Sequence, residues 1–246
     1  MDRLIYTALS GMRASMDQQR VLANNLANAR TPGFRAELLK RTPVTLESET
    51  LDVRAMQAVS VTGARMGAGE LVETGRALDI AVEGEALITV QAPDGGEAYT
   101  RRGDLSLSPA GLLITGEGYP VMGNGGVISV PPGSAPSIAP DGTVSVVDPE
   151  NPQAPAQEIG RIKLAAWAGS PLAKGLDNLF RVEGGGVLPG DAAATVKSGF
   201  IEQSNVKSTE VLVEMIDAQR LFEMRSKLLG TAKELDERGA ALMRLS

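Results

Sequence analysis

Ser204 and Lys207 form an S-x-x-K pattern, the spacing at which some serine hydrolases place a lysine beside a nucleophilic hydroxyl group. Those enzymes carry a second Lys-Thr-Gly-like element far downstream, whereas here Lys197-Ser198-Gly199 precedes the serine and no Ser-Asp-Asn element occurs. We therefore interpret this segment as a strand that leaves a β domain, followed by the polar start of a helix. A serine hydrolase with an S-x-x-K site is the remote alternative.

Three further polar groups have the residue types of binding sites. Gly184-Gly185-Gly186 has no lysine at P-loop spacing, which favours a turn over a phosphate-binding loop. Asp79, Glu83 and Glu85 share parity along an extended segment, so we expect them on one solvated face of a sheet and not around a metal ion. Arg101-Arg102 is expected to be solvated surface with no role in binding nucleic acid.

The composition removes most enzymatic chemistry. The chain has 246 residues with no histidine and no cysteine, so it lacks the usual general base, the commonest metal ligand and any thiolate. Only 3% of the residues are aromatic, so the core must be built from aliphatic side chains and methionine. We predict that the protein is not an enzyme and has no catalytic residues, no cofactor and no metal site.

Charge and hydropathy exclude further classes. The formal net charge is −6, which argues against nucleic-acid binding because phosphate neutralisation needs a basic surface. Residues 1–19 contain no uninterrupted apolar segment and no small-residue cleavage site, so no cleaved signal peptide is predicted. No stretch has the roughly 18 apolar residues of a spanning helix. We therefore predict no direct membrane span.

The two ends of the chain have the periodicity of amphipathic helices. Steps of four and three residues from Ile5 trace an apolar row along residues 2–27, and leucine recurs every seventh residue in 208–246 beside a second apolar row. Each stripe is too narrow to bury a helix on all sides, so each helix needs a partner. The predicted assembly seam comprises Ile5, Leu9, Met12, Met16, Leu26, Met215, Leu221, Phe222, Leu228, Leu229, Leu235 and Leu242.

Between the helices the pattern changes to short alternating runs separated by glycine-containing turn signals. This spacing favours an antiparallel sandwich or a partly open barrel. The predicted fold class is α+β: N- and C-terminal α-helices form a coiled-coil assembly region, and a mainly antiparallel β domain is inserted between them. The predicted divisions are an assembly helix at 1–30, a turn and extended linker at 31–75, a β-rich outer domain at 76–203 and a second assembly helix at 204–246.

The end of the first helix contains asparagines where better helix formers would cost less. We expect Asn28 to cap the helix in a left-handed conformation and Pro32-Gly33 to form the central pair of a type II turn. We expect Asn24 or Asn25 to bond to a neighbouring chain, because a buried amide is satisfied only in the correct register. Phe34 is expected to anchor the start of the linker on apolar surface.

Several blocks of the sequence resemble the signature segments of bacterial flagellar rod and hook proteins. They occur in family order over nearly the whole chain, and the block from Asn24 to Phe34 is the most specific of them. The start of the chain and the short segment 35–77 resemble the proximal-rod type, with a distal-rod or hook-type axial protein as the alternative. The blocks are residues 5–12, 18–38, 78–84, 99–113, 199–206 and 215–224.

The resemblance implies a structural subunit of the flagellar basal-body rod that polymerises helically around the export channel and transmits motor torque. It implies copies of itself and other rod proteins as partners, and the flagellar type III export apparatus as a partner in transit. It also implies a location in the periplasm-spanning rod of the basal body, reached without a cleaved signal peptide. An adhesin-like β domain on a helical stalk is the competing class, and it would need a signal peptide and only one helical partner.

Overall fold

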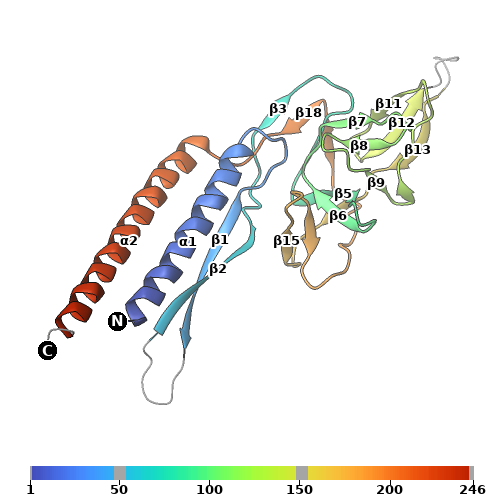
Figure 1. Ribbon diagram of the computed structural model, residues 1–246. Helices are drawn as coiled ribbons and strands as arrows, with labels where there is room; N and C mark the ends of the chain where they lie inside the picture. Colours follow the sequence, from blue (N-terminus) through green and yellow to red (C-terminus); the bar gives the residue numbers. More distant parts are fainter. Residues whose placement is uncertain (1, 47–53, 148–154, 244–246) are drawn as a thin grey trace. The chain divides into compact units, whose positions relative to one another are not determined.

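A computed structural model describes residues 2–46, 54–147 and 155–243, and the chain divides into two compact units (Figure 1). Side chains are described for residues 9–39, 63–147, 155–231, 233 and 234. Two long helices and many short, mainly antiparallel strands give an α+β fold, as predicted. The helical unit comprises Met1–Ala27, Glu37–Thr62 and Val206–Ser246, and the β unit comprises Asn28–Ala36 and Gly63–Asn205. The predicted domain boundaries stay a prediction.

The helical unit holds both helices and one pair of strands. The helices are 26 and 36 residues long, and neither contains a proline that would interrupt its hydrogen bonds. The strands β1 and β2 pair with each other, and β1 runs beside α1 (Figure 1). Part of the expected linker is thus strand. The elements are α1 (Asp2–Ala27), β1 (Glu37–Leu46), β2 (Arg54–Ala64) and α2 (Ser208–Met243).

The β unit consists of short strands whose described pairs are all antiparallel, as the frequent turn signals predict. Its last two strands return along the first two, since β17 pairs with β4 and β18 with β3. The strands are β3 (Leu71–Glu73), β4 (Ile80–Val82), β5 (Ala86–Gln91), β6 (Glu97–Thr100), β7 (Leu105–Leu107), β8 (Leu113–Thr115), β9 (Met122–Gly123), β10 (Gly126–Val127), β11 (Ala135–Ile138), β12 (Thr143–Val147), β13 (Gln157–Arg161), β14 (Leu164–Ala166), β15 (Leu172–Lys174), β16 (Phe180–Val182), β17 (Val196–Ser198) and β18 (Phe200–Glu202).

The largest sheet has five strands in the order β14-β5-β6-β16-β15, and both of its faces are covered. Successive residues of β5 point to opposite faces: Ile88 and Val90 belong to the main aliphatic core, and Leu87 belongs to a second cluster with Tyr99 and Phe180. Burial on both faces explains why β5 is apolar almost throughout instead of alternating. The core is mainly aliphatic, as the scarcity of aromatic residues requires.

An ion pair braces the turn between β15 and β16 and predicts a pH dependence. Arg181 donates to both carboxylate oxygens of Asp177 at 3.1 and 2.7 Å, and Asp177 Oδ1 also accepts the backbone N–H of Leu179. The hydrogen bonds from Arg181 lower the pKa of Asp177 below its ordinary value. Because its pKa is lower in the folded protein, the ionised carboxylate stabilises the fold above the unfolded-state pKa of about 3.9. This stabilisation is lost as the pH falls through the lower pKa of the folded state.

We therefore expect the Asp177 carboxyl to titrate below the ordinary range in a carbon-detected NMR titration, with the turn losing order at the acid end. Arg181→Gln should move that titration upward toward the ordinary value, because the charged donor is lost. An unchanged midpoint in Arg181→Gln would contradict this account of the turn.

Candidate assembly surface

The first helix has a buried face and an exposed apolar face. Its buried residues recur at helical spacing, whereas two members of the predicted seam are exposed: Leu9 at 40% and Met16 at 57%. Met12 and Leu26 are half-buried, and Ile5 lies outside the described side chains. With about 3.6 residues per turn, the predicted seam lies on the other side of the helix from the buried face. The buried residues of α1 are Ala14, Ser15, Val21, Leu22 and Asn25.

The second helix packs on the first through a row that advances by four and three residues in turn. Arg225, in this row, donates to the backbone oxygen of Gly11 and to the hydroxyl of Ser15 on α1. Alternating steps of four and three keep one seam toward a partner helix along several turns. The row consists of buried or half-buried residues, namely Val211, Met215, Ala218, Phe222, Arg225 and Leu229.

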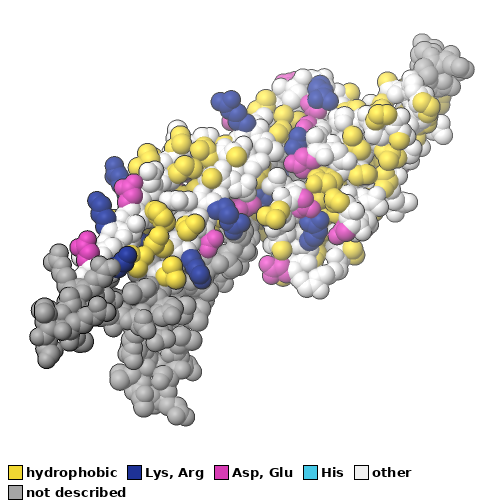
Figure 2. Space-filling model, in the orientation of Figure 1, with side chains coloured by type: hydrophobic (Ala, Val, Ile, Leu, Met, Phe, Trp, Pro, Cys, Tyr) yellow, Lys and Arg dark blue, Asp and Glu magenta, His cyan; other side chains and the backbone are white. Residues whose placement is uncertain are grey.

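The opposite side of α2 carries apolar side chains that are left exposed by the described part of the chain. Leu228 is 66% exposed, although it belongs to the leucine row that the sequence singles out. Leu221 is half-buried, and Leu235 and Leu242 lie outside the described side chains. Figure 2 shows apolar side chains at the surface of the helices among charged ones. The exposed apolar residues of α2 are Leu212, Val213, Ile216, Met224 and Leu228.

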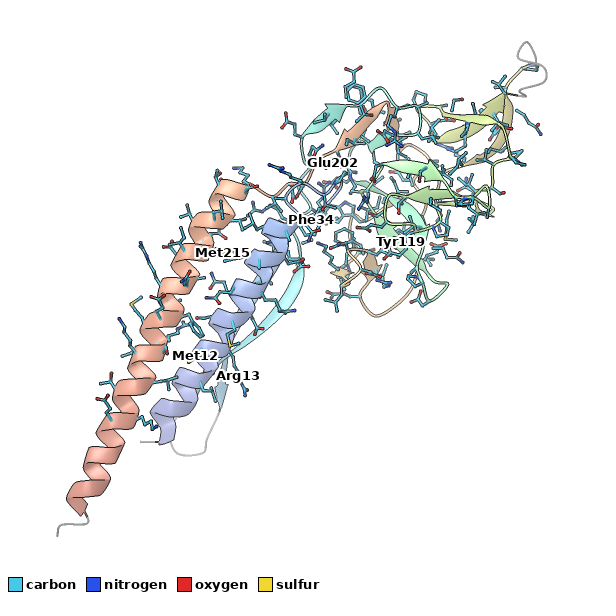
Figure 3. The ribbon with its side chains drawn as sticks, turned by 45° about the horizontal axis from the view of Figure 1, so that its top comes forward. Met12, Arg13, Phe34, Tyr119, Glu202 and Met215 are labelled. Atoms are coloured by element: carbon cyan, nitrogen blue, oxygen red, sulfur yellow. The ribbon has the colours of Figure 1, made fainter. Side chains whose placement is uncertain are left out.

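The residues of the predicted seam therefore lie on two kinds of surface, one packed between α1 and α2 and one exposed. Met215, Phe222 and Leu229 lie in the row that packs on α1, and Met215 and Met12 can be followed on their helices in Figure 3. Leu9, Met16 and Leu228 instead face away from the packed sides, as their exposure indicates. Periodicity found the apolar rows, but it did not separate the row used within the chain from the rows left exposed.

The end of α1 differs in one respect from the prediction. Asn28 does not adopt the left-handed conformation, which Asn178 alone adopts among the described non-glycine residues. Asn28 instead begins a β-turn: its backbone oxygen accepts Thr31 N–H at 3.1 Å, and its side-chain oxygen accepts the Thr31 hydroxyl at 3.1 Å. A left-handed cap is unnecessary here because this turn already carries the chain away from the helix.

The positive backbone angle falls at Gly33 instead. Thr31 O accepts the N–H of Phe34 at 3.2 Å, and Gly33 has a φ of 68° after Pro32. A proline followed by a glycine with positive φ is the pattern of a type II turn, which the Pro-Gly pair predicts. Phe34, just after the turn, is buried, and the Lys174 ammonium lies 3.4 Å from the centroid of its ring.

Asn24 and Asn25 fix the start of β1. The Asn25 amide makes a two-way contact with the backbone of Glu37, accepting its N–H at 2.8 Å and donating to its oxygen at 3.1 Å. Asn24 donates to the Glu37 carboxylate at 2.7 Å. The Asn25 side chain thus pairs with the backbone of Glu37 as a neighbouring strand would, and Asn24 holds the side chain of the same residue. The bond to a neighbouring chain stays a prediction.

The hydrolase-like pair lies where the sequence placed it, between a strand and a helix. β18 ends at Glu202, α2 begins at Ser208, and the Lys207 ammonium pairs with the carboxylate of Glu210 at 2.8 Å. Gly184-Gly185-Gly186 follows β16 with three positive φ angles, as expected of a turn.

Two expectations of solvated surface are wrong in part: Glu83 and Glu85 are exposed as expected, but Asp79 and Arg101 are buried. Asp79 is buried, because β4 is too short for alternation to apply and the chain enters the core at this residue. Its carboxylate accepts the Thr74 hydroxyl at 2.6 Å. Arg101 is only 4% exposed, whereas Arg102 is half-buried and pairs with Asp104 at 2.7 Å. Arg101 is a residue that local sequence patterns missed, because its partners are far away in the chain.

In the described part of the chain, no three acidic side chains gather closely enough to hold a metal ion. Neither α1 nor α2 has, within its described residues, an apolar stretch long enough to cross a membrane.

Comparison with known proteins places these features in a family. Three family models match: "Flagella basal body rod protein" at residues 5–35, "Flagellar hook protein FlgE/F/G D1 domain" at residues 81–146 and "Flagellar basal body rod FlgEFG protein C-terminal" at residues 197–242. The first covers most of α1 and the turn after it, and the last covers β18 and most of α2. The middle one covers most of the strands from β4 to β12 of the β unit.

Relatives match along the whole chain. The flagellar basal-body rod protein FlgF of Salmonella typhimurium is 40% identical over 252 residues, which cover 100% of both chains. FlgF of Escherichia coli is 38% identical with the same coverage. FlgG of Bacillus subtilis is 34% identical over 95% of this chain and 96% of its own. With 38–40% identity to FlgF relatives along the length of this chain, the protein belongs to the flagellar basal-body rod protein family and is a structural subunit of the rod.

Proposed function

We propose that the chain is a proximal-rod subunit whose terminal helices form a coiled-coil layer around the export channel and carry torque without catalysing a reaction. The observation that supports this proposal is the exposed apolar surface of the helices. Leu9 and Met16 on α1, and Ile216 and Leu228 on α2, lie away from the contact between the two helices. Such residues need a partner outside the chain.

The energetics favour assembly through these surfaces. Complete burial of one Leu, Ile or Met side chain contributes roughly 1.5–3 kcal/mol. Several such residues on each helix can offset the loss of motional freedom on association. The exposed rows of α1 and α2 have different sequences, so the exposed row of α1 in one subunit can contact the exposed row of α2 in its neighbour. A contact between two different surfaces repeats without closing and generates an open helical filament.

The proposal extends to partners and location. The partners are further copies of this chain and neighbouring rod proteins, with the flagellar type III export apparatus as a partner during transit. The location is the periplasm-spanning part of the rod. The FlgF relatives, which match over complete chains, support the proximal position over the distal one.

Cysteine cross-linking tests the assembly surface, because the native chain contains no cysteine. We expect Leu228→Cys and Leu9→Cys, combined in one chain, to give covalent multimers when isolated basal bodies are oxidised. The same variant in dilute purified form should stay monomeric and serves as the control. A failure to cross-link in basal bodies that contain the variant would contradict the proposed helix layer.

An assembled basal-body density map tests the position along the rod. The chain should trace next to the base of the rod, below the subunits of the FlgG type. Tracing it in the distal rod or in the hook would favour the alternative axial protein.

A further inference from the structure

Three segments of the β unit that continue into the helical unit meet at one side chain, that of Asn205. Its oxygen accepts the N–H of Ala36 at 2.8 Å, and its amide nitrogen donates to the backbone oxygens of Arg65 at 2.6 Å and Gly67 at 2.7 Å. Its own N–H donates to the Phe34 oxygen at 3.2 Å. One asparagine therefore ties together segments that lie about 30 and 140 residues apart in the chain.

Glu202, three residues earlier, holds the same segments by charge. Its carboxylate is buried and ion-paired with Arg35 and with Arg101, whose Nε lies at 2.7 Å. It also accepts the N–H of Gly69 at 2.6 Å, and its backbone oxygen accepts the N–H of Gly33 at 2.7 Å. Figure 3 labels Glu202 and Phe34 in this region. We call Arg35, Arg101, Glu202 and Asn205 the clasp.

Arg101 connects the clasp to the core of the β unit. Its terminal nitrogens donate to the backbone oxygens of Val82 at 2.8 Å, Gly84 at 3.0 Å and Ala86 at 2.6 Å. Burial lowers the pKa of Arg101, and the charge of Glu202 opposes that effect. A buried charge pair of this kind contributes little net stability, but it specifies one arrangement because breaking it leaves an unpaired buried charge.

The backbones around the clasp lie too close together for side chains. A Cβ atom at Gly69 would lie 1.9 Å from the Gln203 oxygen. The segments that leave the β unit are therefore fixed by hydrogen bonds, by charge and by steric contact, with no room to slide. Each continues directly into the helical unit: Ala36 precedes β1, and Asn205 precedes the segment that opens α2.

We infer that the clasp is the positioning element through which torque passes from the helices into the β unit. This inference rests on the proposed function, since it presumes that the helices are driven within the rod. A junction held by buried ion pairs resists shear because every displacement separates opposite charges at low dielectric. An apolar contact would slide with little change in its energy.

Glu202→Gln tests this inference, with Glu97→Gln as the matched control. Glu97 pairs with Lys163 at 2.8 Å on the large sheet and has no part in the clasp. In purified protein, Glu202→Gln should raise amide exchange at Gly33, Ala36 and Gly69 at least tenfold. Exchange at Leu87, in the core, should stay unchanged. The control should leave all four amides as in the native chain.

The motility measurement separates torque transmission from a merely structural role. Cells with Glu202→Gln should swim at near-native speed in dilute medium and lose speed several-fold more steeply than native cells as viscosity rises. A native response to viscosity would overturn the inference. If Glu202→Gln does not fold, Asn205→Asp provides the same test, because it keeps the acceptor for Ala36 and loses both donated hydrogen bonds.

The cross-linking experiment distinguishes failure of this inference from failure of the proposed function. Introduced into the clasp variant, the cysteines at positions 9 and 228 should still cross-link in basal bodies. Cross-linking together with native swimming at high viscosity would overturn the clasp alone. Loss of cross-linking in the native clasp background would overturn the helix layer on which it rests.

Discussion

Leu228→Asp is expected to abolish swimming while leaving the β unit folded. Leu228 is 66% exposed on the face of α2 away from the row that packs on α1, so an aspartate there disturbs no packing within the chain. In the proposed helix layer the same position is buried against a neighbour. The variant then loses roughly 1.5–3 kcal/mol of apolar burial at each contact, and it also places an unpaired charge in a desolvated seam.

The measurement combines a soft-agar motility assay with circular dichroism and thermal unfolding of the purified chain. The motility zone should equal that of cells lacking the protein, and the unfolding midpoint should stay near the native value. Ser226→Asp is the matched control, because it adds the same charge at an exposed polar position of the same helix. Normal swimming by Leu228→Asp would remove Leu228 from the assembly surface.

The helices and the β-rich middle could be predicted because their signals are local. A heptad-like row identifies a helix from its own residues, and short alternating runs between turns identify strands. The assignment of faces could not be predicted in the same way. Met215 and Leu228 both belong to apolar rows of the sequence and cannot be told apart by periodicity. Which of them is covered depends on the packing of α1, which lies some 200 residues earlier in the chain.

The clasp could not be predicted from local patterns for the same reason. Arg35 and Glu202 are 167 residues apart, and Arg101 and Glu202 are 101 apart. An Arg-Arg pair beside a glycine has residue types that are typical of the protein surface. Arg101 is buried only because segments that are distant in the sequence converge around it. The resemblance to flagellar rod proteins did mark the blocks that contain these residues. The structure adds that the block containing Arg35 (residues 18–38) and the block containing Glu202 and Asn205 (residues 199–206) bind each other.

Gly33→Ala is expected to destabilise the β unit strongly. Gly33 has a φ of 68°, and a Cβ atom there would lie 2.4 Å from the backbone carbon of Arg101. The left-handed conformation alone costs an alanine roughly 1–2 kcal/mol. The overlap is with backbone atoms, so either the turn or the segment that carries Arg101 has to shift. We expect a total loss of at least about 3 kcal/mol, which lowers the unfolding midpoint by about 6–12 °C for a chain of this size.

Gly84→Ala separates the two causes. Gly84 has nearly the same φ of 70°, but a Cβ atom there would meet nothing within 4 Å. It should therefore show the conformational cost alone, about 1–2 kcal/mol. The difference between the two variants in chemical denaturation measures how firmly the turn is pressed on the clasp. Equal losses in both would mean that the turn can move away from Arg101, and a junction that yields in this way could not hold the connecting segments rigid under torque.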